Sequence, residues 1–308
     1  MWDKNQKTLK SQINFSGIGL HSGKNADVKI DPAEADIGVV FKRTDLKENN
    51  EIHANFKNVS SAKLCTKIQN NFGVSVSTIE HLMAAFYICG IDNVLVKING
   101  PEIPIMDGSA KDFVEMIKKS GFKTLNKKRK FLKISRRVNL EESGRSISIK
   151  PANNTFDVSF TLSYDNPLIK TQSNKTSFQE NNLESIYVAR TFCLHEDVEK
   201  IKSAGLAKGG SLDNAIVVKG DKILNKEGLR SNKEFVNHKI LDLAGDFMLA
   251  GMRVIGSVDC IHGGHELTNN FLRKVFSDRA NFEITENPAA SLNVRKIASI
   301  QKRLAVNA

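Results

Sequence analysis

Residues 235–251 read Phe235-Val236-Asn237-His238-Lys239-Ile240-Leu241-Asp242-Leu243-Ala244-Gly245-Asp246-Phe247-Met248-Leu249-Ala250-Gly251. The apolar positions recur at helical spacing and the closing glycine is a typical helix stop, so the pattern predicts an amphipathic helix. His238 and Asp242 lie four positions apart and therefore share one helix face, where they can bind the same cation. A catalytic metal site normally has three protein ligands and an open position, so a third ligand has to come from elsewhere.

A second stretch, residues 78–90, has the same design: an amphipathic helix that ends at a glycine and runs into a strand-like segment. His81 lies nine positions before this glycine, and Asp242 lies nine positions before Gly251. We infer that the chain consists of two related halves. If they pack face to face about a pseudo-twofold axis, His81 meets His238 and Asp242. The competing interpretation is that these are ordinary polar residues, because His-x-x-x-Asp occurs often by chance.

Two imidazoles and one carboxylate suit Zn2+, with Fe2+ as the alternative. Such an ion lowers the pKa of a bound water to about 7. Glu80 precedes His81 and points about 100 degrees away around the helix, where it can reach this water as a general base. His265, in the loop 259–267, would as a cation stabilise an oxyanion and protonate a leaving amine. These groups together favour hydrolysis of an amide or an ester.

Length and composition indicate a globular protein of two domains. The chain has 308 residues, a length greater than one hydrophobic core usually serves. Of these residues 40% are hydrophobic and 26% are charged. Its four cysteines form no CxxC pair, which favours reduced thiols. Residues 1–7 lack the apolar core of a signal peptide, and no apolar run reaches about 20 residues. We therefore expect a cytoplasmic protein.

The net charge of +11 favours an anionic partner. The chain has neither the mixed aromatic and basic pattern of RNA-binding modules nor zinc-finger spacing, so we expect no nucleic acid partner. An anionic substrate, or an anionic membrane surface that presents it, fits the charge better. The alternative is that the lysines only solvate the surface.

Alternating or apolar runs bounded by turn residues predict the strands. In the first half these runs cover 8–18, 26–30, 38–43, 61–68, 74–77 and 93–98; in the second half they cover 131–138, 146–150, 156–162, 175–178, 215–218 and 253–258. Further helices are predicted over 111–120 and 195–204, and from the loop after residue 258 to about residue 276.

Four other features bear on the site. His21, in the glycine-rich turn 17–23, is either a substrate contact or a hydrogen-bonded turn residue. Asp107 either orients His81 or closes a turn with the following glycine. We interpret His53 and His195 as surface residues.

The charged run 126–130 is interpreted as a solvated linker that marks the domain boundary. The segment 191–211, apolar and bounded by glycines, has no counterpart of similar character in the first half. It is either a groove for an apolar chain or ordinary core packing.

Six ordered motifs carry a resemblance that covers nearly the whole chain. They are Gly17-Ile18-Gly19-Leu20-His21-Ser22-Gly23, Ser77-Thr78-Ile79-Glu80-His81-Leu82, residues 101–110, Ala189-Arg190-Thr191-Phe192, Asn237-His238-Lys239-Ile240-Leu241-Asp242 and Gly264-His265. Together they resemble the UDP-3-O-acyl-N-acetylglucosamine deacetylases of bacterial lipid A synthesis. No departure from the family pattern occurs at the metal or acid/base positions.

The resemblance implies an α+β fold of two related two-layer α/β sandwich domains, packed face to face with the active site between them. On this basis we expect domains at 1–126 and 131–308, joined by the linker 127–130. It implies a zinc-dependent deacetylase that releases acetate from the glucosamine nitrogen. We expect a monomer, in at most peripheral contact with the inner membrane surface. The alternative is a metal-dependent amidase that acts on a different acetylated sugar or acyl substrate.

The resemblance also implies roles for individual residues. The metal ligands would be His81, His238 and Asp242, and the catalytic residues would be Glu80 as base, His265 as acid, Thr191 on the oxyanion and Asp246 behind His265. Lys239 would contact a substrate phosphate. The acyl passage would be lined by Phe192 and the insertion that follows it, and the substrate-binding set includes Leu20, Gly210 and Ser211.

Overall fold

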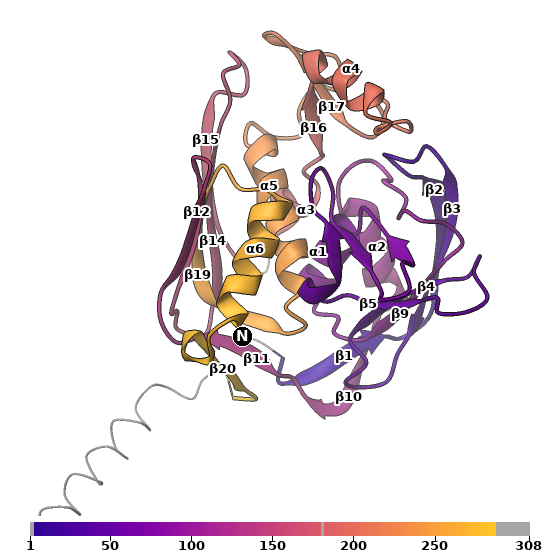
Figure 1. The fold of residues 1–308 in the computed structure, drawn as a ribbon, viewed down its shortest axis with the longest axis vertical. Coiled ribbons are helices and arrows are strands. Elements are labelled where there is room, and N and C mark those ends of the chain that lie inside the picture. Colours follow the sequence, from indigo (N-terminus) through magenta and orange to yellow (C-terminus); the bar gives the residue numbers. More distant parts are fainter. Residues whose placement is uncertain (1–2, 180–181, 288–308) are drawn as a thin grey trace, which may run out of the picture.

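The computed structural model describes residues 3–179 and 182–287. Its helices and sheets form an α+β fold (Figure 1), which confirms the predicted fold class. The end of the predicted C-terminal domain, residues 288–308, lies outside the described residues. Within them, no helix is long and apolar enough to cross a bilayer.

The first half is built on a five-stranded sheet in the order β2, β3, β9, β4, β5. Its strands are β2 (Ile13–Ile18), β3 (Asn25–Pro32), β9 (Val94–Ile98), β4 (Val39–Arg43) and β5 (Glu51–His53). Neighbours are antiparallel except β4 and β9, which run parallel. Alternate residues of β3 and β9 are buried under α1 (Glu80–Cys89) and α2 (Lys111–Ser120).

The second half repeats this topology. Its strands are β12 (Val138–Glu142), β13 (Arg145–Lys150), β19 (Arg253–Ile261), β14 (Phe156–Ser163) and β15 (Thr171–Ser177). The equivalent pair, β14 and β19, is again the parallel one. Helices α5 (Glu234–Met248) and α6 (His265–Phe276) flank β19 in sequence as α1 and α2 flank β9. The prediction of two related halves is therefore confirmed.

Two strands extend the second sheet, and each half carries an insertion. β11 (Phe131–Ile134) pairs with β19 and with β20 (Phe282–Thr285). The first half inserts β6 (Val59–Ser61), β7 (Lys67–Gln69) and β8 (Ser75–Val76) before α1. The second inserts α3 (Glu184–Tyr187), β16 (Phe192–Leu194), α4 (His195–Ser203), β17 (Ile216–Lys219) and β18 (Lys222–Ile223) before α5. The second insertion thus has a counterpart in position, although its apolar character is its own.

The two halves pack through their helices. Figure 1 shows the two large sheets on the outer sides of the molecule, with α1, α2, α5 and α6 between them. The apolar faces of both sheets and of these helices form one continuous core. The halves approach closely at Gly245 of α5, where a Cβ atom would lie 2.0 Å from the backbone oxygen of Glu80 in α1. The absence of a side chain there lets the two central helices touch.

Both central helices end near the predicted glycines. Gly90 directly follows α1 with φ of 75°, and Gly251 follows the last turn after α5 with φ of 73°. Glycine adopts this left-handed conformation without steric cost. The start of the chain differs from the prediction: the run 8–18 contains the end of β1 (Asn5–Leu9) and the whole of β2, which belong to different sheets.

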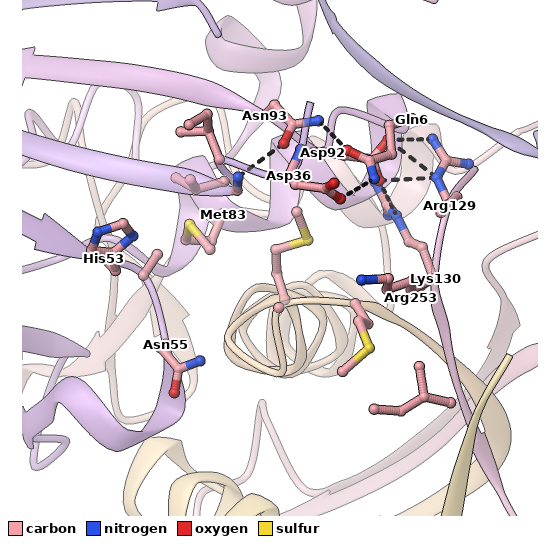
Figure 2. A pocket seen from close by; sticks show the side chains of 18 residues that line it. Gln6, Asp36, His53, Asn55, Met83, Asp92, Asn93, Arg129, Lys130 and Arg253 are labelled. Carbon is pink, nitrogen blue, oxygen red and sulfur yellow. Dashed lines mark hydrogen bonds and ion pairs between the residues drawn. The ribbon is translucent and has the colours of Figure 1, made fainter. Parts of the chain in front are cut away.

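The charged run 126–130 is not a solvated linker. β10 (Phe122–Lys128) pairs with β1, so residues 127 and 128 belong to a strand. Arg129 is only 3% exposed and donates to the Asp92 carboxylate at 2.7 and 2.9 Å (Figure 2). It also donates to the Gly90 carbonyl. The interpretation was wrong because this guanidinium neutralises a carboxylate and caps the C-terminal end of α1. The domain boundary at 127–130 stays a prediction.

Candidate metal centre and active site

His81, His238 and Asp242 converge between the two halves. His81 is the second residue of α1, and the other two lie one turn apart on α5. The Nε2 atoms of both histidines lie 3.4 Å from Oδ1 of Asp242. One potential ligand atom of each residue lies within 4.8 Å of the others, and all three side chains are buried. The convergence predicted from the glycine alignment is confirmed.

The arrangement fits a tetrahedral metal ion. Two ligand atoms about 2.0–2.1 Å from one ion are separated by about 3.3 Å at the tetrahedral angle, close to the 3.4 Å seen here. Nδ1 of His238 faces the Ala189 carbonyl at 3.0 Å, which leaves Nε2 as the free nitrogen. Among the described residues Oδ1 of Asp242 has no hydrogen-bond partner. A buried carboxylate oxygen of this kind calls for a cation.

Electrostatics keep His238 and Asp242 in forms that can bind a metal. Burial lowers the pKa of His238 to about 3, so its imidazole is neutral. Burial alone would raise the pKa of Asp242, but His238 and Lys239 outweigh it and hold the pKa well below its usual range. The Lys239 ammonium lies 3.0 Å from Oδ2 of Asp242. A neutral imidazole and an ionised carboxylate are the forms that bind a divalent metal.

Glu80 and His265 form a second pair beside the metal ligands. Oε1 of Glu80 lies 3.8 Å from Nε2 of His265, and Nδ1 of His265 lies 2.8 Å from Oδ2 of Asp246. Thr66 ties the two carboxylates together: its amide donates to Glu80 at 3.0 Å and its hydroxyl donates to Asp246 at 2.6 Å. The predicted base and acid therefore lie in one hydrogen-bonded cluster that spans α1, α5 and α6.

The protonation states in this cluster differ. Burial raises the pKa of Glu80. Burial alone would lower the pKa of His265, but the carboxylates of Asp246 and Glu80 raise it to about 10. The imidazole is therefore cationic at neutral pH. A carboxylate next to an imidazolium, both out of bulk water, is an arrangement suited to acid–base chemistry.

A mostly apolar pocket of about 320 Å3 adjoins these groups. All five residues expected to contact the oxyanion or substrate outside the charged groups line it: Leu20, Thr191, Phe192, Gly210 and Ser211. Val198 and Ile201 of α4 complete one wall. Thr191 lines the pocket, and two residues earlier the Ala189 carbonyl contacts the His238 imidazole. The pocket therefore lies next to the candidate metal ligands.

The remaining candidates are placed as follows. Lys239 lies over the Phe192 ring, 5.4 Å from its centroid, as well as beside Asp242. The Asp107 carboxylate closes a turn by accepting from Ser109 and also binds Arg230, so the turn interpretation holds and it does not orient His81. His53 and His195 are exposed, as predicted. The His21 backbone amide donates to Glu102 within the turn and its side chain lines the pocket, while its contact with substrate stays a prediction.

Three residues that contribute to the site are not among the predicted site residues, although Ala189 and Glu102 lie within quoted motifs. Thr66 acts through a hydroxyl and a backbone amide, and Ala189 acts through its carbonyl alone. Glu102 is a buried carboxylate in the loop after β9, and its hydrogen bonds reach the turn before α1. None of the three has a spacing relation to the metal ligands, so only the spatial arrangement identifies them.

Comparison with known proteins agrees with this geometry. A family model described as UDP-3-O-acyl N-acetylglycosamine deacetylase matches residues 6–277. Several UDP-3-O-acyl-N-acetylglucosamine deacetylases are similar to this chain over most of their length. The protein from Geotalea uraniireducens is 45% identical over 273 residues, 88% of this chain and 88% of its own. That from Aliivibrio fischeri is 40% identical over 91% of this chain and 92% of its own, and that from Blochmanniella floridana is 39% identical over 91% and 95%. The chain, whose buried His-His-Asp group and Glu80–His265 pair lie between its two halves, belongs to the UDP-3-O-acyl N-acetylglycosamine deacetylase family.

Proposed function

We propose that the protein is a zinc-dependent deacetylase that hydrolyses the acetamide of a UDP-linked 3-O-acyl-N-acetylglucosamine to a free amine and acetate. The observation that carries the proposal is the buried set of two imidazoles and one carboxylate beside an apolar pocket. The names of the relatives supply the substrate. The step belongs to lipid A biosynthesis.

His81, His238 and Asp242 would hold the zinc ion, with Fe2+ as the alternative metal. When bound, zinc supplies a Lewis acid that polarises the acetamide carbonyl and lowers the pKa of a coordinated water. The neutral His238 imidazole and the ionised Asp242 carboxylate are ready for this role without further proton loss.

Glu80 is the general base, which accepts a proton from the attacking water as the water oxygen adds to the acetamide carbon. Its raised pKa makes its carboxylate a stronger base than an exposed one. His265 is cationic and gives its Nε2 proton to the departing nitrogen as the carbon–nitrogen bond breaks. Asp246 holds the imidazole through Nδ1.

The other residues bind and orient the substrate. Thr191 donates its hydroxyl to the oxyanion, and Lys239 contacts a phosphate of the nucleotide. The apolar pocket takes the acyl chain along Phe192, Leu20, Gly210 and Ser211. The net charge of +11 favours a dianionic substrate and, at most, peripheral contact with the inner membrane surface. We expect a cytoplasmic monomer that does not bind nucleic acid.

The test is a deacetylation assay with purified protein on the UDP-linked 3-O-acyl-N-acetylglucosamine. We expect turnover that chelation abolishes and zinc restores. The matched substrate without the 3-O-acyl chain should turn over poorly, because the apolar pocket would stay empty. Equal turnover of both substrates would remove the pocket from the proposal, and turnover that survives complete chelation would remove the metal.

Two variants separate the roles of ligand and base. Glu80→Gln should retain stoichiometric zinc while kcat falls by about 100-fold or more, because only the proton acceptor is lost. His238→Ala should lose zinc as well as turnover. Full zinc occupancy in the second variant, or an unchanged kcat in the first, would reassign these residues.

A further inference from the structure

Glu102 is a buried carboxylate that the reaction as described does not use. It is 2% exposed and accepts three hydrogen bonds: from the amides of His21 at 2.8 Å and Ser22 at 2.7 Å, and from the Thr78 hydroxyl at 2.8 Å. The glycine-rich turn wraps closely around it, since a Cβ atom on Gly19 would lie 2.5 Å from its Oε2. A carboxylate with three donors and little water holds its neighbours in one geometry.

The Thr78 hydroxyl fixes an unfavourable backbone conformation. Thr78 has φ of 56°, in the left-handed region that β-branched residues rarely adopt. Such conformations persist where the surroundings hold them, often at functional sites. Thr78 is followed by Ile79, and then by Glu80 and His81, the first two residues of α1. The conformation at Thr78 therefore determines the position of the first turn of α1, which carries the proposed base Glu80 and the proposed ligand His81.

The other two hydrogen bonds of Glu102 hold the wall of the apolar pocket. The turn at residues 19–22 supports the segment 207–211, which lines the pocket. Gly209 donates to the Leu20 carbonyl at 3.0 Å, and Lys208 donates to the His21 carbonyl at 3.4 Å. His21 lines this pocket and a second cavity that shares Leu64 with it. Its Nδ1 is buried without a hydrogen-bond partner among the described residues.

We propose that Glu102 is a positioning residue that joins the substrate pocket to the start of α1. Through Thr78 it sets the positions of Glu80 and His81, and through the turn at residues 19–22 it sets the wall of the apolar pocket. This inference rests on the proposed deacetylase function. It assigns Glu102 no contact with the reacting atoms.

The α1 arm is tested by Thr78→Val, which removes the hydroxyl and keeps the shape, with Thr78→Ser as the matched control. Thr78→Val should lower kcat about tenfold or more, leave KM within about twofold, and speed the loss of zinc to a chelator about tenfold. Thr78→Ser should match the wild type in all three. If the two variants agree in kcat and in zinc loss, the hydroxyl does not position α1 and the proposal fails.

Glu102→Gln tests both arms, because it replaces one of the two acceptor oxygens by an NH2 group, which donates hydrogen bonds and cannot accept them. It should lower kcat and also raise KM for the acylated substrate. The double variant Glu102→Gln/Thr78→Val should have the kcat of Glu102→Gln alone, since both changes break one connection. Additive losses, or a Glu102→Gln variant altered only in unfolding temperature, would overturn the proposal.

The readouts also distinguish this inference from the proposed function. A wild-type protein that binds zinc but does not deacetylate the substrate would refute the function. The zinc-loss comparison of Thr78→Val with Thr78→Ser would still decide whether the hydroxyl positions His81. Normal wild-type turnover with no difference between these two variants would refute the positioning role alone.

Discussion

The His265 imidazole is held between carboxylates from two different helices. Asp246 of α5 binds its Nδ1 at 2.8 Å, and Glu80 of α1 lies 3.8 Å from its Nε2. These charges raise its pKa to about 10 against the burial that would lower it. The imidazole is therefore protonated at neutral pH, as the proposed role of general acid requires, and the same proton contributes to folding stability.

The stability should therefore depend on pH through His265. A pKa raised from 6.5 to about 10 means that the protonated imidazole stabilises the folded state. This contribution is complete below pH 6.5 and is lost as pH rises through 10. We expect His265→Gln to lose stability at neutral pH and to show a smaller decline between these two pH values. The measurement is urea unfolding across this range, with chelator present so that metal binding does not vary.

His53→Gln is the control for this experiment, because His53 is exposed and lies outside the cluster. Its stability should follow the wild type at every pH. A decline of the same size in wild type and His265→Gln would show that another group carries the effect.

At the residue scale, the sequence predicted the groups that act through side chains at regular spacing. His238 and Asp242 follow from a helix period, and His81 follows from its distance to a glycine. Ala189 could not be predicted, because a backbone carbonyl acts whatever the side chain is, and the hydroxyl and amide of Thr66 have no regular spacing to the other site residues. Burial raises the pKa of Glu80, and the Asp246 and Glu80 carboxylates raise that of His265, and both surroundings exist only in the assembled fold.

The contact between α1 and α5 is the central feature at the element scale. Gly245 brings the helix axes together, since even a methyl group there would overlap the Glu80 backbone. The same closeness places the ligand atoms of His81 and Asp242 3.4 Å apart. Helix packing and metal geometry are thus fixed by one glycine.

Gly245→Ala should separate the two helices. We expect the protein to lose about 1–3 kcal/mol of stability, as for other overpacked cores, and to lose zinc to a chelator faster than the wild type. Gly100→Ala is the milder control, because its Cβ would meet only the Ala26 side chain, at 3.3 Å. Wild-type zinc retention in Gly245→Ala would mean that the helices tolerate the added methyl group.

The sequence predicted elements better than it predicted their pairing. Periodicity and terminal glycines located α1 and α5 closely, because both signals are local. The run 8–18 was predicted as one strand, yet its two parts join different sheets. β1 pairs with the distant β10, whereas β2 pairs with the next strand, β3. A pattern of alternating residues carries no information about which sheet a strand joins.

At the scale of the whole molecule, buried arginines hold the halves together. Arg253 of β19 is 1% exposed and donates to the Phe86, Tyr87 and Ile91 carbonyls around the end of α1. Its side chain also lies over the Tyr87 ring. Arg129 binds Asp92 and Gly90 on the same end of this helix. The charged run interpreted as a solvated linker is in fact part of this connection.

Arg253→Met should therefore weaken the association of the halves. Removing the guanidinium leaves buried carbonyls without donors, and we expect a loss of about 3 kcal/mol in the free energy of unfolding. Arg136→Met, which removes an exposed ion pair with Asp278, is the control and should change little. Equal urea midpoints for the two variants would contradict the role of Arg253.

The metal ligands come from both halves of the chain, His81 from the first and His238 with Asp242 from the second. During synthesis the ribosome must therefore release most of the polypeptide before all three ligands can meet. A nascent first half presents one imidazole and no cage. On the proposed function, a metal ion can therefore be bound by all three residues only after both halves have folded and docked.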